Sequence, residues 1–298
     1  MPAALAGLRF DQALARLVPE HSRSRLQHWI DAGSVTLDGS VVAAKRRIAG
    51  GERIVVTAPE AVAVSADAPQ AIALAVVHED DAILVVDKPA GLVVHPGSGN
   101  RDGTLLNALL HHAPGQSALP RAGIVHRLDK DTSGLLVVAK TAVAQTDLVR
   151  QLAARAVKRE YVAIVRGDLA RALTIDAPIG RHPTARTTMA VVAAGKPART
   201  HVAPVERFGA ATLVRCTLET GRTHQIRVHL AAVGHALVGD PAYGGRRATP
   251  QVPPFGRQAL HAARLGLVHP ESRAPMEWTS PLPADLAALI ARLREARG

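Results

Sequence analysis

The chain has 298 residues, of which 47% are hydrophobic, enough for one large domain with its own core and a smaller second one. A single cysteine, Cys216, excludes an intrachain disulfide framework and a zinc site made of several cysteines. Lys and Arg number 36 against 25 Asp and Glu, and the net charge of +11 favours a polyanionic partner such as a nucleic acid.

Residues 1–58 are predicted to form a small separate domain with one basic side. Helices are expected at 8–18 and 23–33, and Asp38-Gly39 has the composition of a tight turn between two strands of a hairpin. A further strand is expected at 52–56. Because basic residues gather in this segment, we expect RNA contacts from Arg23, Arg25, Lys45, Arg46 and Arg47.

Residues 59–73 are rich in Ala and Pro and are predicted to form a linker to a second domain, 74–298. That domain mixes strand-like and amphipathic segments, which indicates an α+β fold with mostly hairpin-linked strands. Strands are expected within 74–91, 134–140, 158–167, 199–207 and 211–219. Helices are expected at 104–112, 141–156, 223–234 and 284–298.

The segment GIVHRLDKDTSGLLVVAKT (123–141) places a polar turn between two apolar strands. Polar groups between buried strands are costly unless they are satisfied or used, so Asp129 is a candidate catalytic carboxylate. The structural alternative is that Asp131 and Thr132 cap the turn by bonding nearby backbone N–H groups.

Two other segments supply candidate neighbours for this carboxylate. In ETGRTHQIRVHL (219–230), Arg222 stands at the expected start of a helix. It can pair with a carboxylate there and keep it ionised, or it can be an ordinary phosphate-binding or surface arginine. In VKREYVAIVRG (157–167), Tyr161 is one of two tyrosines, and a tyrosine in a strand is commonly a core residue.

Together with DKPAGLVVHPG (87–97), VGDPAYGG (238–245) and RQALHAARLGLVHP (257–270), these segments resemble the RluA/RluD family of pseudouridine synthases. The combination of HRLDKDTSG and GRTHQIR is the most specific part of the resemblance. The N-terminal residues are similar to the alpha-L RNA-binding module of a small-subunit ribosomal protein. The resemblance implies a catalytic domain with a long bent, mixed but mostly antiparallel sheet and flanking helices.

The resemblance also implies roles for five residues. Asp129 corresponds to the catalytic aspartate, and Arg127 to the arginine that fills the space left by a flipped nucleotide. Tyr161 corresponds to the tyrosine that stacks on uracil. Arg222 corresponds to the arginine that forms a salt bridge with the aspartate, and Ile226 to a position under the uracil that is usually leucine.

Conversion of uridine to pseudouridine breaks the bond between the sugar and ring nitrogen one and rejoins the sugar to ring carbon five. Nothing is oxidised and no group is imported, so we expect no cofactor and no metal. The nucleotide must leave its stack and enter a pocket, where an ionised carboxylate acts on it as a nucleophile or as a base.

The expected substrate is large-subunit ribosomal RNA, with transfer RNA as the alternative and no DNA partner. We expect a monomer. We also expect a cytoplasmic protein without a membrane partner, because no apolar run approaches the roughly 20 residues of a membrane span and no signal peptide is evident. Two other functions fit parts of the sequence. One is a non-enzymatic RNA-binding protein that keeps the fold, and the other is a metal-dependent hydrolase that uses Asp129 and Asp131.

Overall fold

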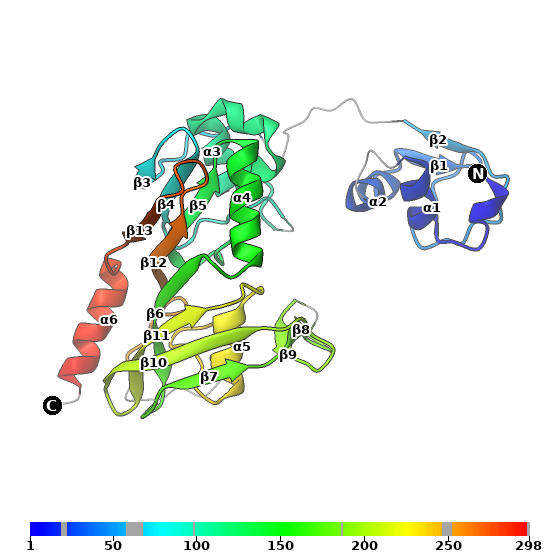
Figure 1. Cartoon of the computed structure of the whole chain (residues 1–298). Helices are drawn as coiled ribbons and strands as arrows, with labels where there is room; N and C mark the ends of the chain where they lie inside the picture. The colour runs from blue at the N-terminus through cyan, green and yellow to red at the C-terminus, as the bar shows by residue number, and fades with distance from the viewer. Residues whose placement is uncertain (19–22, 58–67, 98, 186, 246–251, 297–298) are drawn as a thin grey trace. The chain divides into compact units, whose positions relative to one another are not determined.

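The computed structural model describes residues 1–18, 23–57, 68–97, 99–185, 187–245 and 252–296 (Figure 1). The chain divides into two compact units, Met1–Ser65 and Ala66–Gly298. Much of the predicted linker lies outside the described residues. Its described part is bonded to the second unit, where the side-chain amide of Asn107 donates to the carbonyl of Ala68 at 2.8 Å.

The first unit contains η1 (Ala3–Leu5), α1 (Phe10–Leu17), α2 (Arg23–Asp31), β1 (Val35–Leu37) and β2 (Ile54–Val56). Both predicted helices and the strand predicted at 52–56 are therefore confirmed. Apolar side chains of the two helices and of β1 form a separate core, whose buried members include Phe10, Leu14, Leu26, Ile30 and Val35.

The predicted hairpin at Asp38-Gly39 is wrong in its second half. Asp38 and Gly39 do form a tight turn, with φ values of 50° and 78°, but it closes only a single bridge between Leu37 and Ser40. β1 pairs instead with β2, in antiparallel register. The pairing extends past β1, because the backbone N–H of Asp38 donates to the carbonyl of Arg53 at 2.8 Å.

The second unit is built on one long sheet. Its strands are β3 (Val76–Glu79), β4 (Ile83–Lys88), β5 (Ser133–Ala139), β6 (Lys158–Arg166), β7 (Leu173–Asp176), β10 (Arg199–Arg207), β11 (Ala211–Leu218), β12 (Leu260–Val268) and β13 (Pro275–Thr279). Within the described residues the order of this nine-stranded sheet is β3-β4-β5-β12-β6-β11-β10-β7, and β13 pairs with β12. Only β5 and β12 pair in parallel, so the predicted mixed, mostly antiparallel sheet is confirmed. β8 (Ile179–Arg181) and β9 (Met189–Val191) form a separate pair.

Helices cover both faces of the sheet (Figure 1). They are α3 (Leu105–His112), α4 (Ala142–Ala153), α5 (Gln225–Ala232) and α6 (Ala284–Glu295), and the short helices η2 (Pro114–Ala118) and η3 (Pro120–Gly123) follow α3. Alternate side chains of the strands point to opposite faces, so Leu136 packs with α3 and α5 on one face while Leu135 packs with α4 on the other. α6 packs against Ile164 of β6. None of the described helices has the length and apolar character that a bilayer crossing requires.

Candidate active site

A cavity of about 830 Å³ lies where the loop before β5, strand β6 and the segment leading into α5 meet. Three segments that are distant in sequence therefore line one open cavity. Every residue to which the sequence analysis gave a role in catalysis or uracil binding lines it, namely Arg127, Asp129, Tyr161, Arg222 and Ile226.

The side chain of Asp129 is 16% exposed and faces two basic side chains. Its Oδ2 accepts a hydrogen bond from Nη1 of Arg227 at 3.0 Å. Its Oδ1 lies 3.8 Å from Nε2 of His224. A carboxylate held by a buried guanidinium on one side and open to a cavity on the other is positioned to act on a ligand.

The predicted salt bridge between Arg222 and Asp129 is wrong, because the partner of Asp129 is Arg227. α5 begins only at Gln225, so Arg222 lies before the helix, where it is exposed and its Nε donates to the carbonyl of Pro197 at 3.1 Å. Arg227 lies in the first turn of the helix and is buried, with a side chain only 6% exposed. Carboxylate partners offset the cost of burying the guanidinium of Arg227.

Arg227 is fixed by a second carboxylate that the sequence analysis did not single out. Its Nε and Nη2 donate to the two carboxylate oxygens of Asp240 at 2.7 and 2.9 Å. Asp240 is fully buried and also accepts hydrogen bonds from the backbone N–H groups of Ala242 and Tyr243. Burial lowers the pKa of Arg227, but the hydrogen bonds to Asp240 and the charge of Asp129 outweigh it, so the pKa is raised. The signal for Asp240 was the motif VGDPAYGG.

His224 orients a second donor toward Asp129. Its backbone has a φ of 58°, and its Nδ1 lies 2.8 Å from the hydroxyl of Tyr243. That hydroxyl accepts a hydrogen bond from the backbone N–H of Met189, so its own proton is available for Nδ1. Burial lowers the pKa of His224 despite the nearby Asp129. The imidazole is therefore neutral near pH 7, and its Nε2 faces the carboxylate.

The loop that carries Asp129 is fixed by hydrogen bonds from a buried lysine. Nζ of Lys88 donates to the carbonyls of Pro89, Leu92 and Lys130 at 2.8, 2.9 and 2.9 Å. Burial lowers the pKa of Lys88 to about 8. Because Lys130 directly follows Asp129, this ammonium group fixes the backbone of the loop that carries Asp129.

The same loop is bonded to the start of β12. Nη1 of Arg257 donates to the carbonyl of Asp131 at 3.0 Å, and Nε2 of Gln258 donates to the hydroxyl of Thr132 at 3.2 Å. The predicted turn is present, since the backbone N–H of Thr132 donates to the carbonyl of Asp129 at 3.1 Å. The hydroxyl of Thr132 accepts its bond from Gln258, which lies just before β12, so the turn is stabilised by a distant segment and not only by local capping.

The histidine of the HRLD motif, His126, forms a hydrogen bond with the backbone of β5. Nε2 of His126 accepts a hydrogen bond from the N–H of Val137 at 3.1 Å. Burial, helped by the charge of Arg159, lowers the pKa of His126 to about 3, so it is neutral near pH 7. His126 thus supports β5 on the side away from β4.

Tyr161 and Ile226 give the cavity an apolar surface. Both are buried members of the same core cluster, although Tyr161 lies on β6 and Ile226 in the first turn of α5. Burial raises the pKa of Tyr161, so its hydroxyl stays protonated near pH 7. Arg127 lines the cavity with an exposed side chain.

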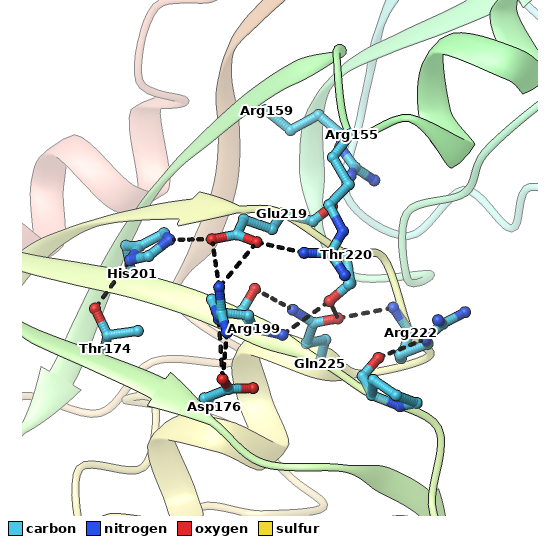
Figure 2. Close-up of polar contacts among 11 residues, drawn as sticks. Arg155, Arg159, Thr174, Asp176, Arg199, His201, Glu219, Thr220, Arg222 and Gln225 are labelled. Atoms are coloured by element: carbon cyan, nitrogen blue, oxygen red, sulfur yellow. Dashed lines mark hydrogen bonds and ion pairs between the residues drawn. The ribbon is translucent and has the colours of Figure 1, made fainter.

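Gln225, which sequence reasoning missed, fastens the segment that leads into α5 (Figure 2). Its Oε1 accepts hydrogen bonds from the hydroxyl of Thr220 and the backbone N–H of Arg222 at 2.7 and 2.9 Å. Its Nε2 donates to the carbonyl of Arg199 and the hydroxyl of Thr200, both at 3.0 Å. A buried amide with four partners fixes where α5 begins, and so where Arg227 points.

The basic residues of the first unit are only partly described. Lys45, Arg46 and Arg47 are exposed, and the guanidinium of Arg47 donates to the carbonyl of Gly7 at 2.7 Å. Arg23 and Arg25 belong to α2, but their side chains lie outside the described structure. RNA contacts from these five residues remain predictions.

Comparisons with known proteins indicate the family. A family model described as RNA pseudouridylate synthase matches residues 82–232, and the S4 domain model matches residues 8–54. "Ribosomal large subunit pseudouridine synthase D" of Nitrosomonas europaea is 57% identical over 298 residues, covering 99% of this chain and 87% of that protein. The protein of the same name from Pseudomonas aeruginosa is 54% identical, covering 100% and 95%. The solved structure "Human RNA Pseudouridylate Synthase Domain Containing 1" has a TM-score of 0.59 and 29% identity, covering 76% of this chain and 96% of that one.

Proposed function

The chain belongs to the RNA pseudouridylate synthase family and carries an S4 domain, and from this premise we propose that Asp129 isomerises uridine in large-subunit ribosomal RNA. The observation that carries the proposal is the pairing of Asp129 with Arg227 inside the cavity, at 3.0 Å. The names of the relatives support ribosomal RNA of the large subunit as the substrate.

Each of the cavity residues has a distinct role in this proposal. The target uridine leaves its stack, and Arg127, exposed at the cavity, occupies the gap that it leaves. The uracil lies against the ring of Tyr161, with Ile226 beneath it. The carboxylate of Asp129, held in place by its hydrogen bond from Arg227, acts at the sugar.

The reaction balances without any imported group. The bond from sugar carbon one to ring nitrogen one breaks, the uracil turns, and a bond from sugar carbon one to ring carbon five forms. The proton on carbon five is lost and nitrogen one gains one, so there is no net change in protons. Tyr161, with its neutral hydroxyl beside the ring, relays the proton that leaves carbon five.

The first unit supplies affinity. We propose that Arg23, Arg25, Lys45, Arg46 and Arg47 contact RNA phosphates, which supports binding that weakens as salt rises. We also propose that the protein acts as a monomer in the cytoplasm and does not act on DNA.

The proposal is tested by incubating the protein with large-subunit RNA fragments or with transfer RNA, and then analysing the digested nucleosides for pseudouridine. We expect pseudouridine in a large-subunit fragment, and none when Asp129→Asn replaces the wild type. Asp131→Asn is the matched control, because it changes a carboxylate of the same loop and is expected to retain turnover. Comparable turnover by Asp129→Asn would refute the role of Asp129, and conversion of transfer RNA alone would refute the substrate.

A further inference from the structure

We propose that Arg159 is a further substrate-binding residue, which binds a backbone phosphate beside the extruded uridine. The inference rests on the proposed function. It concerns a cation in the cavity to which neither the sequence motifs nor the reaction assigned a role.

Arg159 shares the cavity with Tyr161. The two residues stand two positions apart on β6, so their side chains project from the same face of the strand. Arg159 lines the cavity and is only 7% exposed. Its charge also opposes protonation of His126, which places the guanidinium close to the catalytic loop.

The guanidinium of Arg159 is poorly satisfied within the described protein. Its Nε is buried without a hydrogen-bond partner, and its Nη2 reaches the carbonyl of Glu219 only at 3.5 Å. Figure 2 shows Arg155, Arg199 and His201 converging on the carboxylate of Glu219, with Arg159 apart from it. Arg159 forms no ion pair with a carboxylate among the described residues.

A buried cation without an anion costs free energy, and the cost is offset when an anion enters the cavity. The charged residues of the lining are Arg121, Arg127, Asp129, Arg159, Arg222 and Arg227. Since Asp240 already compensates Arg227, the remaining lining is strongly positive. An extruded nucleotide brings its phosphates with it, and the planar fork of donors on arginine matches a phosphate.

Gly221 provides the room that this guanidinium occupies. A Cβ added at Gly221 would lie 2.6 Å from Nη1 of Arg159, and Gly221 does not adopt the left-handed backbone that disfavours alanine. Gly221→Ala therefore displaces the guanidinium without changing residue 159. It provides a second, independent perturbation of the same contact.

The experiment uses the full chain and a stem-loop of large-subunit RNA, with affinity measured over a series of KCl concentrations. For Arg159→Gln we expect about tenfold weaker binding and a salt slope reduced by about 0.7, the loss of one phosphate contact. Gly221→Ala is expected to change both quantities in the same direction. Arg155→Gln is the matched control, because Arg155 is exposed and lies outside the cavity lining.

A neutral methylphosphonate beside the target uridine completes the test. It should weaken binding to the wild type by a similar factor and add no further loss to Arg159→Gln. Weaker binding with an unchanged salt slope, or affinity like that of Arg155→Gln, overturns the inference. If Arg159→Gln does not fold, the affinity and salt slope of Gly221→Ala test the inference instead. Absence of pseudouridine formation by the wild type would instead count against the proposed function.

Discussion

Nη1 of Arg227 lies 3.0 Å from Oδ2 of Asp129, a residue 98 positions away in the sequence. The other edge of the same guanidinium is held by Asp240, which is closed off from solvent. Arg227 is thus fixed at one edge and presents the other to a carboxylate that borders the cavity. The position of Asp129 depends on this bridge between two acids.

Arg227→Ala is predicted to damage stability as well as catalysis. It leaves Asp240 buried without its partner, so we expect the free energy of unfolding to fall by about 3–5 kcal/mol, as for other broken buried ion pairs. Urea unfolding measures this loss. Arg227→Lys, which retains the charge, is expected to fold and to have a reduced single-turnover rate, because lysine cannot bind both carboxylates in the same geometry.

Arg222→Ala provides the contrast. Its side chain is exposed and bonded to a backbone carbonyl, so we expect a change in unfolding free energy below about 0.5 kcal/mol and an effect mainly on KM. Equal losses of single-turnover rate in Arg222→Ala and Arg227→Lys would contradict the assignment of the ion pair.

Tyr161 is predicted to combine two separable properties. Burial raises the pKa of its hydroxyl, so Tyr161→Phe keeps the ring and removes only a neutral O–H group. We expect Tyr161→Phe to bind RNA like the wild type but to turn over slowly at saturating RNA. Tyr161→Leu should bind about tenfold more weakly, since stacking on an aromatic ring contributes about 1–3 kcal/mol per base. Normal turnover by Tyr161→Phe would exclude a role for the hydroxyl in proton transfer.

Lys88 is predicted to make stability rise with pH. Its pKa is about 8 in the folded protein against 10.5 when exposed, so between these values the unfolded chain binds more protons. The contribution of Lys88 to the free energy of unfolding should therefore increase by about 2 kcal/mol between about pH 7.5 and 9.5. Urea unfolding at both pH values measures it, with Lys88→Arg as a control that does not titrate in this range. The same pH dependence in both proteins would show that Lys88 is not its source.

Activity is predicted to withstand metal removal. The proposed reaction imports no group and assigns its steps to side chains, so turnover should persist in excess EDTA. The substrate for this assay should be a short stem-loop that folds without Mg²⁺, so that RNA unfolding is not mistaken for enzyme inhibition. Loss of turnover that Zn²⁺ or Mg²⁺ restores would favour the metal-dependent alternative with Asp129 and Asp131.

The sequence predicted which residues line the cavity better than it predicted which of them form ion pairs with each other. Asp129 and Tyr161 stand in segments with a clear strand or turn pattern, and both line the cavity. From the sequence, the salt bridge was assigned to Arg222 and Arg227 was not considered. α5 begins only at Gln225, which is fixed through bonds to β10. The local sequence pattern of this segment does not predict the hydrogen bonds that Gln225 makes to β10.

The same distinction holds for the fold. Strands β10 and β11 were predicted because their apolar residues are close in sequence and joined by a short turn. The second strand of the hairpin after Gly39 was predicted on equal local grounds and is wrong, because only Ser40 bridges to Leu37 and β1 pairs with the distant β2 instead. The position of β12 between β5 and β6 likewise follows from long-range packing, which local sequence patterns do not predict.

The bonds from Arg257 and Gln258 to the catalytic loop have a consequence for biosynthesis. The loop leaves the ribosome well over one hundred residues before Arg257 and Gln258, as the 126 positions between these partners show. A nascent chain therefore holds Asp129 in an unbraced loop until translation is nearly complete. We expect competence to modify RNA to arise late, on or after release, so that a growing chain does not act on the ribosome that is making it.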